Sequence, residues 1–413
     1  MKEICPKNKC TGCFACVTAC PHNCIRMQED EYGELHPIVD EVRCVNCGIC
    51  ERTCPNNKEL LFNRPLLCYA SWITDNKKRR ICASGGIGTI LSEYVIKECG
   101  GIVFGSRYND SLTPIMSYTD KLNELEYFKG SRYVQSIVGD ETFKNVLLFL
   151  KSGRKVLFVG TPCQIAGLKC FLRNDYDNLI TVDLICHGCT PTRYFEDELA
   201  QICETGKYSN ISDIRFRGND RHNFCFSLWK GNSCVYNKKG STSYYLAGFL
   251  HGVTLRTNCF NCLYARPERI SDITIGDFIG IGKKVPFNYS KRNVSCVLIN
   301  TSKGQKFYEE VATNSSVLMN VEREYEERLD YKPSLVEPFP KHELTDMFRK
   351  EYLNGGYKYA SRKVLSESVR EYEIIERKRN IINIFLLPYR VIRKLYRIMH
   401  NCIRRFLNKI AIQ

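Results

Sequence analysis

Nowhere in its 413 residues does the chain contain the roughly 20 consecutive apolar residues that a membrane-spanning helix needs. The first 24 residues also lack the apolar segment of a secretory signal peptide, because they are polar and rich in cysteine. Acidic residues are missing from residues 377–413, where ten Lys or Arg stand without any Asp or Glu. These absences exclude a spanning helix, predict a cytoplasmic chain, and place +10 of the net charge of +15 in one terminal segment.

Cysteine, in contrast, is abundant, with 24 copies in the chain. In a small secreted protein this number would indicate disulfides, but here the cysteines fall into metal-ligand spacings. Thiolates that hold iron must stay reduced, which again favours the cytoplasm. The length is too great for one compact core and predicts two or three domains.

Two runs of four cysteines with identical spacing lie in residues 1–60. Each run has two-residue gaps between its first three cysteines, a three-residue gap before the fourth, and a proline after it. In this pattern three successive thiolates hold one cubane and the fourth reaches the partner cluster. The runs therefore predict two [4Fe-4S] clusters, one on Cys10, Cys13, Cys16 and Cys54, the other on Cys44, Cys47, Cys50 and Cys20. Tetrathiolate zinc is the alternative, and Cys5 and Cys24, outside the pattern, are interpreted as spare or buried thiols.

The fold class expected is α+β: a bacterial-type 2[4Fe-4S] ferredoxin domain over residues 1–60, an α/β domain over residues 65–340, and a helical tail over residues 345–413, basic and amphipathic from about 377. Alternation of short apolar runs with amphipathic segments supports the middle assignment. The pattern predicts helices over residues 87–99, 143–151, 162–172, 192–203, 244–255 and 322–329, and strands over residues 102–105, 155–160, 179–186, 213–217, 224–230, 273–277 and 295–299.

Four polar or small-residue motifs follow the ferredoxin segment. Residues 83–89 form a glycine-rich start to a helix, which suits a phosphate, although a simple tight turn explains it as well. Residues 130–136 offer a cation, hydroxyls and an amide in a loop. Residues 160–164 and 185–188 stand at the ends of two strands, where α/β sheets bind ligands.

Together with the pair Cys259-x2-Cys262 and the segment 272–277, these motifs resemble the beta subunit family of coenzyme F420-reducing hydrogenases and dehydrogenases over roughly residues 1–340. The resemblance implies an iron–sulfur flavoprotein that binds FAD and exchanges electrons with a two-electron acceptor. It implies that the FAD site contains Ser84, Gly85, Gly86, Thr89, Ser131, Tyr133, Gln135 and Ser136. The tail has no counterpart in this resemblance.

The remaining cysteines suggest a third [4Fe-4S] cluster. Cys163 and Cys186 end neighbouring strands, and Cys259 and Cys262 form a two-residue-gap pair before another strand, so all four could meet at one sheet edge. The alternative is that Cys163 is a catalytic or structural thiol and the pair is merely buried. Cys189 is a less favoured substitute for Cys186.

Two residues are candidates for acid–base roles. Asp277 follows a glycine at a strand end, where a turn or helix-cap aspartate is equally consistent with the pattern. His187 could donate a proton or a hydrogen bond to the flavin, and a neutral structural histidine is the alternative.

The basic tail has an apolar stripe at three- to four-residue spacing opposite a cationic face. Such a helix can lie on an anionic membrane surface, or it can dock onto the body or onto a partner subunit. Few aromatic residues stand beside the basic ones, which argues against nucleic acid.

The function expected is that of an oxidoreductase passing electrons from the ferredoxin-type clusters to FAD and on to a small organic acceptor. Two alternatives stay open: a non-catalytic electron-transfer subunit of a partner enzyme, and a subunit that reduces or oxidises coenzyme F420. The partner expected is ferredoxin or another subunit, and the location is the cytoplasm or the inner face of the membrane.

Overall fold

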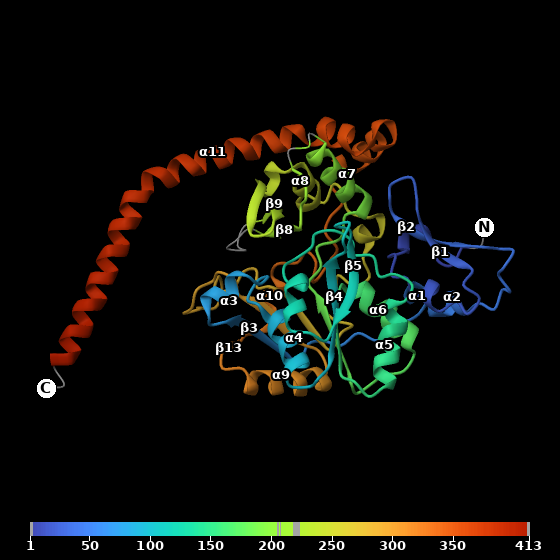
Figure 1. Cartoon of the computed structure of the whole chain (residues 1–413), viewed down its shortest axis with the longest axis horizontal. Coiled ribbons are helices and arrows are strands. Elements are labelled where there is room, and N and C mark those ends of the chain that lie inside the picture. The colour runs from blue at the N-terminus through green and yellow to red at the C-terminus, as the bar shows by residue number, and fades with distance from the viewer. Residues whose placement is uncertain (1–2, 205, 207, 218–223, 411–413) are drawn as a thin grey trace.

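A computed structural model of the chain describes residues 3–204, 206, 208–217 and 224–410, with residues 383, 384 and 386–410 described as backbone alone. The chain begins with the cysteine-rich module and ends with a long helix, and between them the strands of a three-stranded sheet are inserted between those of an eight-stranded sheet (Figure 1). The predicted mixed α/β fold is confirmed.

The N-terminal module is small and built around one hairpin. Strand β1 pairs antiparallel with β2, so that Ile25 lies opposite Val39. The module consists of η1 (Lys7–Lys9), α1 (Ala15–Thr18), β1 (Ile25–Glu29), β2 (Leu35–Val39), α2 (Ile49–Thr53) and η2 (Pro55–Asn57).

The centre of the molecule is an eight-stranded mixed sheet in the order β13-β3-β12-β11-β7-β6-β4-β5. The four strands β11, β7, β6 and β4 run parallel, and the outer pairings are antiparallel. The strands are β3 (Leu67–Ile73), β4 (Ile102–Tyr108), β5 (Pro114–Thr119), β6 (Val156–Gly160), β7 (Leu179–Leu184), β11 (Ile273–Asp277), β12 (Ser295–Ile299) and β13 (Leu318–Glu322).

Helices cover both faces of this sheet because successive strand residues point to opposite sides. Phe104 and Phe158 pack with α5 and α6, whereas Val103 and Leu157 pack with α4 and α9. The cysteine-rich module shares the first of these cores, so it packs against the α5–α6 side. The helices concerned are α3 (Asn76–Arg80), α4 (Ile87–Lys97), η3 (Asn123–Phe128), α5 (Thr142–Lys151), α6 (Pro162–Leu172), α9 (Ser302–Asn314) and α10 (Tyr325–Leu329).

A second, three-stranded antiparallel sheet in the order β10-β9-β8 packs with neighbouring helices into a separate aromatic core. Its elements are α7 (Thr192–Cys203), β8 (Asp213–Arg217), β9 (Phe224–Lys230), β10 (Ser233–Lys239), η4 (Gly240–Thr242), α8 (Tyr244–Leu250) and η5 (Thr257–Asn261). The helix predicted over residues 244–255 ends earlier, because Gly252 takes a left-handed conformation with φ 74°. The helix predicted over residues 322–329 begins only at Tyr325, since Glu322 still belongs to β13.

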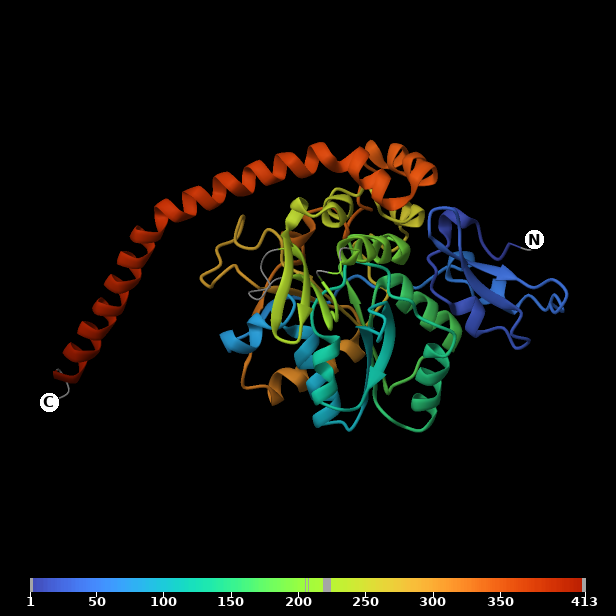
Figure 2. The ribbon, with the colours of Figure 1, turned by 45° about the horizontal axis from the view of Figure 1, so that its top comes forward.

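The last element, α11 (Leu344–Ile410), bends at Gly355 and Gly356, whose backbone angles are not helical. Its first part packs on the aromatic core through Phe348, Tyr357 and Val364. Beyond that part the helix leaves the body, and its end lies on the opposite side of the molecule from the cysteine-rich module (Figures 1 and 2).

Candidate functional site

The two cysteine runs repeat one backbone conformation. Gly12 and Asn46, which follow the first cysteine of each run by two positions, are left-handed with φ 63° and 53°. Phe14 and Gly48, two positions further on, are left-handed with φ 66° and 71°, and each precedes a short helix. Alternate left-handed residues wind each run into a sharp turn, which is the shape that directs successive thiolates toward one centre.

The four cysteines predicted for the first cluster lie together. Burial raises the pKa of Cys16 well above its ordinary value, and the thiolates of Cys13, Cys10 and Cys54 raise it further. All four line one cavity. Four sulfurs around one cavity are the donor set that a [4Fe-4S] cluster requires, so these residues fit the group.

The second predicted set is more open to solvent. Cys47 is exposed, Cys44 is half-buried, and Cys20 and Cys50 are buried. Burial and a hydrogen bond to Cys20 raise the pKa of Cys24 to about 12, and Cys44 contributes as well. The structure thus places Cys20 and Cys44 at one site together with Cys24.

Two cysteines outside the runs contact the predicted ligands, which spacing did not indicate. Hydrogen bonds to Cys10 and Cys54 raise the pKa of Cys5, and the Cys24 sulfur lies 3.3 Å from that of Cys20. Each set therefore has a fifth thiol beside it.

A third group of cysteines meets at the edge formed by the carboxyl ends of the parallel strands. Cys163 follows β6 in the first turn of α6, and Cys186 follows β7. Burial raises the pKa of Cys163, and the thiolates of Cys186 and Cys262 raise it further. Burial and the thiolates of Cys262 and Cys186 do the same to the pKa of Cys259. The four residues predicted for a third cluster are therefore neighbours.

Cys189 is a fifth member of this group. Its thiol donates a hydrogen bond that lowers the pKa of Cys186, and its backbone N–H lies 3.4 Å from the Cys259 sulfur. Cys189 thus lies within the third group and is hydrogen-bonded to two of its members. The sequence had suggested it only as a substitute for Cys186.

The first and third groups are adjacent. A methyl group placed on Gly167 of α6 would lie 3.0 Å from the Cys13 sulfur, so the module packs directly on the helix that carries Cys163 in its first turn. Burial raises the pKa of Tyr264, as do the thiolates of Cys163 and Cys13. The Tyr264 hydroxyl is buried without a partner among the described residues, as expected of a donor to a cluster sulfur.

A buried ion pair lies close to the third group. Arg269 and Asp183, with exposures of 1% and 0%, are 3.1 Å apart. Burial raises the pKa of Asp183, while Arg269 opposes that shift. The hydrogen bond from Cys189 lowers the pKa of Cys186, and Arg269 lowers it further. Burial raises the pKa of Cys262 to about 11, and Arg269 opposes that shift.

The first predicted flavin segment lies at the same sheet edge, beside β3 and β12. A methyl group on Gly85 would lie 2.3 Å from the Ser71 carbonyl oxygen, and Gly86 is left-handed with φ 88°. Ser84 donates to the Val294 carbonyl at 3.3 Å. Close packing against the two strands therefore accounts for both glycines. Thr89 lies in α4, which begins directly after them.

The second predicted segment is held by protein contacts. The Gln135 amide donates to the Thr11 carbonyl of the cysteine-rich module and accepts from Arg256. The hydroxyls of Ser136 and Ser106 are 2.6 Å apart. Gln135 therefore joins the module to the body. Tyr133 and Ser136 lie near the sheet edge, Tyr133 through Arg217 and Ser136 through Ser106 of β4, and Ser131 is hydrogen-bonded to Tyr133.

The two candidate acid–base residues are apart from each other. Asp277, at the end of β11, pairs with Arg217 of β8, and Arg217 also donates to the Tyr133 hydroxyl at 2.8 Å. His187 lies 3.0 Å from the Phe249 carbonyl and packs against the Phe249 and Phe339 rings. Burial lowers the pKa of His187 to about 4, so it is a neutral ring in a packed environment.

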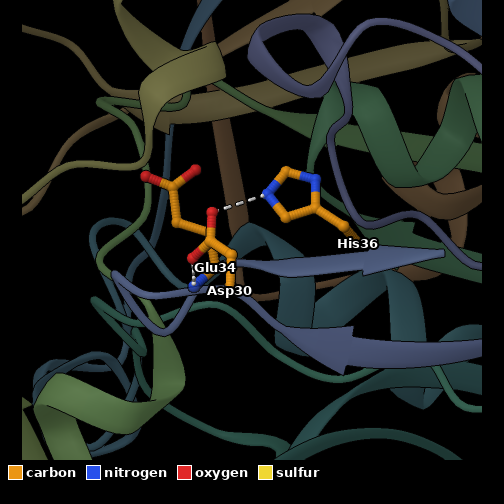
Figure 3. A group of neighbouring side chains, drawn as sticks. All are labelled: Asp30, Glu34 and His36. Carbon is orange, nitrogen blue, oxygen red and sulfur yellow. Dashed lines mark hydrogen bonds and ion pairs between the residues drawn. The ribbon is translucent and has the colours of Figure 1, made fainter. Parts of the chain in front are cut away.

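Asp30, Glu34 and His36 form a further cluster at the hairpin end (Figure 3). Asp30 pairs with His36 at 3.2 Å and accepts two backbone N–H groups. Glu34 pairs with Arg349 of α11 at 2.9 Å and accepts from Thr257. Because protein donors occupy both carboxylates, we assign this cluster to the docking of the module onto the body.

Residues 153–323 match the family model for the C terminus of the coenzyme F420 hydrogenase/dehydrogenase beta subunit, and residues 9–58 match the 4Fe-4S dicluster domain. An uncharacterized protein of Methanocaldococcus jannaschii is 23% identical over 370 residues, covering 79% of this chain and 94% of that protein. A chain of the F420-reducing [NiFe] hydrogenase complex from Methanosarcina barkeri is 18% identical with a TM-score of 0.44, covering 73% of this chain and 92% of its own length. The predicted family resemblance and the predicted pair of N-terminal [4Fe-4S] clusters are confirmed by the two family matches.

The apolar stripe predicted for the tail falls mostly on residues whose side chains lie outside the described part of the chain. Within the described part, Ile381, Ile382 and Phe385 of α11 are exposed. Among the described residues, no helix combines the length and the apolarity that crossing a bilayer requires.

Proposed function

Because residues 153–323 match the coenzyme F420 hydrogenase/dehydrogenase beta subunit family and residues 9–58 match a 4Fe-4S dicluster domain, we propose that the chain is a member of that family and an iron–sulfur flavoprotein oxidoreductase. It passes electrons from the ferredoxin-type module through a third [4Fe-4S] centre at the sheet edge to FAD, and on to an organic two-electron acceptor. When bound, the flavin would connect one-electron transfer by the clusters with two-electron transfer to the acceptor.

The observation that carries this proposal is the contact between the first and third cysteine groups. Burial raises the pKa of Cys163 most. The thiolates of Cys186 and Cys262 on one side and of Cys13 on the other also raise it. Gly167 lets the Cys13 loop approach α6 without an intervening side chain. A continuous row of thiolates from the module to the ligand-binding edge of the sheet is the arrangement expected of an electron path.

Flavin binding is supported by position. Both segments that the resemblance implies, residues 84–89 and 131–136, lie along the edge that also carries the third cysteine group. Between them Arg217 holds the Asp277 carboxylate and the Tyr133 hydroxyl in fixed positions. We assign to these three residues the orientation of the flavin and its acceptor.

The test is Cys163→Ser, with Cys203→Ser on α7 as the matched control because Cys203 is also half-buried but belongs to none of the three groups. Anaerobically reconstituted Cys163→Ser protein should lose one cubane of iron and keep the signals of the other two. Electrons supplied to the module should then reduce the flavin at least tenfold more slowly. Wild-type protein with only two cubanes, or without FAD, would contradict the proposal.

A second candidate is a non-catalytic electron-transfer subunit, which the occupied side chains of the edge favour. Asp277 is engaged by Arg217, and His187 by the Phe249 carbonyl and two rings. Neither side chain is poised to give a proton to a substrate. Reduced holoprotein offered organic acceptors, coenzyme F420 among them, separates the candidates: oxidation by an acceptor alone supports the enzyme, and oxidation only by a partner protein supports the electron-transfer role.

We further propose that the free part of α11 binds an anionic membrane surface. Its sequence carries ten cations without an acid from residue 377 on, and three described apolar side chains near its start are exposed. The full chain should float with vesicles rich in anionic lipid at low salt but not with neutral vesicles, and a chain ending at Glu376 should not float. Equal recovery of both chains would count against this role.

A further inference from the structure

Arg256 is one of the most deeply buried side chains of the molecule, with 1% exposure. Its guanidinium donates only to neutral oxygens. Nε donates to the Asn258 side chain at 3.1 Å, and Nη1 donates to the Gln135 side chain. Nη2 donates to the backbone carbonyls of Cys10 at 3.2 Å and Leu35 at 3.3 Å.

Among the residues that the structure describes, no carboxylate forms an ion pair with this guanidinium. Arg269, equally buried, has Asp183 at 3.1 Å. A cation taken out of water without a counter-charge is strongly unfavourable. Arg256 therefore calls for a negative charge that the side chains around it do not supply.

The position of Arg256 indicates where that charge resides. Its backbone N–H donates to the Cys189 carbonyl at 2.9 Å, and its carbonyl accepts from the Cys259 N–H at 3.0 Å, so its main chain belongs to the third cysteine group. Its side chain crosses to the Cys10 carbonyl in the first group. Arg256 lies where these two groups meet.

Other charges near this position are already paired, His36 with Asp30 and Arg349 with Glu34. The positive charge of Arg256 is therefore left facing the two cysteine groups, with its side chain on the Cys10 carbonyl and its main chain hydrogen-bonded to Cys189 and Cys259.

We propose that Arg256 is the shared counter-cation of the first and third iron–sulfur centres and raises the reduction potentials of both. The proposal rests on the third centre of the proposed function. A cluster held by four thiolates is negatively charged and gains another negative charge on reduction, so a nearby fixed cation favours the reduced state. One cation acting on two neighbouring centres also keeps their potentials close, which favours electron transfer in either direction.

The experiment is an anaerobic redox titration followed by electron paramagnetic resonance on the reconstituted full chain, comparing wild type with Arg256→Gln and Arg256→Lys. In Arg256→Gln the first and third centres should shift to lower potential by at least a tenfold change in the reduced-to-oxidised ratio, about 59 mV for one electron. The second centre, on Cys20, Cys44, Cys47 and Cys50, should not shift and serves as the internal reference. Arg256→Lys keeps the charge and should stay near wild type.

The matched control is Arg328→Gln, which removes another guanidinium of 1% exposure that donates to the carbonyls of Asp277 and Tyr331. Its first and third centres should titrate as in wild type. If Arg256→Gln does not fold, Gln135→Glu replaces it, because a carboxylate against Nη1 neutralises the cation in place and should lower both potentials.

Unchanged potentials in Arg256→Gln or in its replacement would overturn the proposal, and so would a fall in Arg256→Lys as large as that in Arg256→Gln. A wild-type protein without a third centre would instead defeat the proposed function, and the shift of the first centre alone would then decide whether Arg256 acts as a counter-cation.

Discussion

Two glycines inside helices that flank the main sheet differ in what surrounds them. A methyl group on Gly167 of α6 would lie 3.0 Å from both the Cβ and the sulfur of Cys13, whereas the nearest atom to one on Gly88 of α4 is Ile275 Cδ1 at 3.5 Å. We expect Gly167→Ala to destabilise the protein by about 1–3 kcal/mol through overpacking and to reduce bound iron. Gly88→Ala, in the first turn of α4 and with room for the methyl group, should stabilise it by roughly 0.5 kcal/mol, because alanine restricts the unfolded chain more than glycine does.

Anaerobic urea unfolding and iron determination on both variants measure these effects. Equal behaviour of the two variants would show that the contact between the Cys13 loop and α6 is not tight, and would weaken the proposed electron path with it.

At this scale the sequence predicted what is local. The two runs indicate two clusters because ligand spacing is a property of a short loop, and the first set indeed surrounds one cavity. Cys5 and Cys24 could not be placed, and Cys189 was suggested only as a substitute for Cys186, because the neighbours of these thiols are set by chain turns and tertiary contacts that no spacing records. Arg256 carried no sequence signal for the same reason, since its partners are 121 and 246 positions away.

Helix α7 carries a buried titratable residue, Glu198, that faces α11. Burial raises the pKa of Glu198 to about 7, although Arg362 of α11 and Tyr357 partly offset the shift. A carboxyl whose folded-state pKa exceeds its unfolded value of roughly 4.5 destabilises the fold as it ionises. Stability is therefore lost as the pH rises from about 5 to about 8, by about 2 kcal/mol.

Glu198→Gln should remove this loss, so its stability advantage over wild type should grow between these pH values. Glu204→Gln is the control, because Glu204 also contacts α11, through Lys358, but both side chains are exposed. Urea unfolding at each pH measures the difference. A constant difference across the range would show that Glu198 is ionised throughout.

Most strands with a strong apolar pattern were predicted from the sequence, whereas the edge strands β5, β10 and β13 and the buried interior strand β3 were missed. The central strands β6, β7 and β12 are buried on both faces and consist mostly of apolar residues. Strand β10 is mostly exposed and polar, and β13 is half-buried, so periodicity marks neither. Pairing with β9 and β3 makes them strands.

At the scale of the whole molecule, Glu34 connects the cysteine-rich module to both the body and α11. This carboxylate, buried in the hairpin of the module, accepts from Thr257 of the body and pairs with Arg349 of α11. We expect Glu34→Ala to destabilise the docked arrangement by roughly 3 kcal/mol, because it leaves a largely buried cation without its partner. Limited proteolysis should then cut faster between the module and the body, near residue 60.

Glu29→Ala is the control, since Glu29 of β1 pairs with Arg193 of α7 across the same boundary but in solvent. Its effect should stay below about 1 kcal/mol. Equal cleavage rates in both variants would show that the Glu34 contact does not hold the module.

How the parts assemble was beyond sequence reasoning, even though each part was recognised. The shared core between the module and α5–α6 joins residues more than a hundred positions apart. The direction of the long helix depends on Gly355 and Gly356, which turn it before it leaves the body. Such arrangements follow from the fit of whole surfaces, which no local pattern encodes.

The difference in solvent exposure between the two cysteine runs determines which of the two clusters is more sensitive to oxygen. Cys47 faces water, while Cys10, Cys13, Cys16 and Cys54 are sealed in the apolar core between module and body. Oxidants attack accessible thiolates first. Damage by oxygen therefore begins at the outer cubane, and the same packing that joins the two parts shields the inner one.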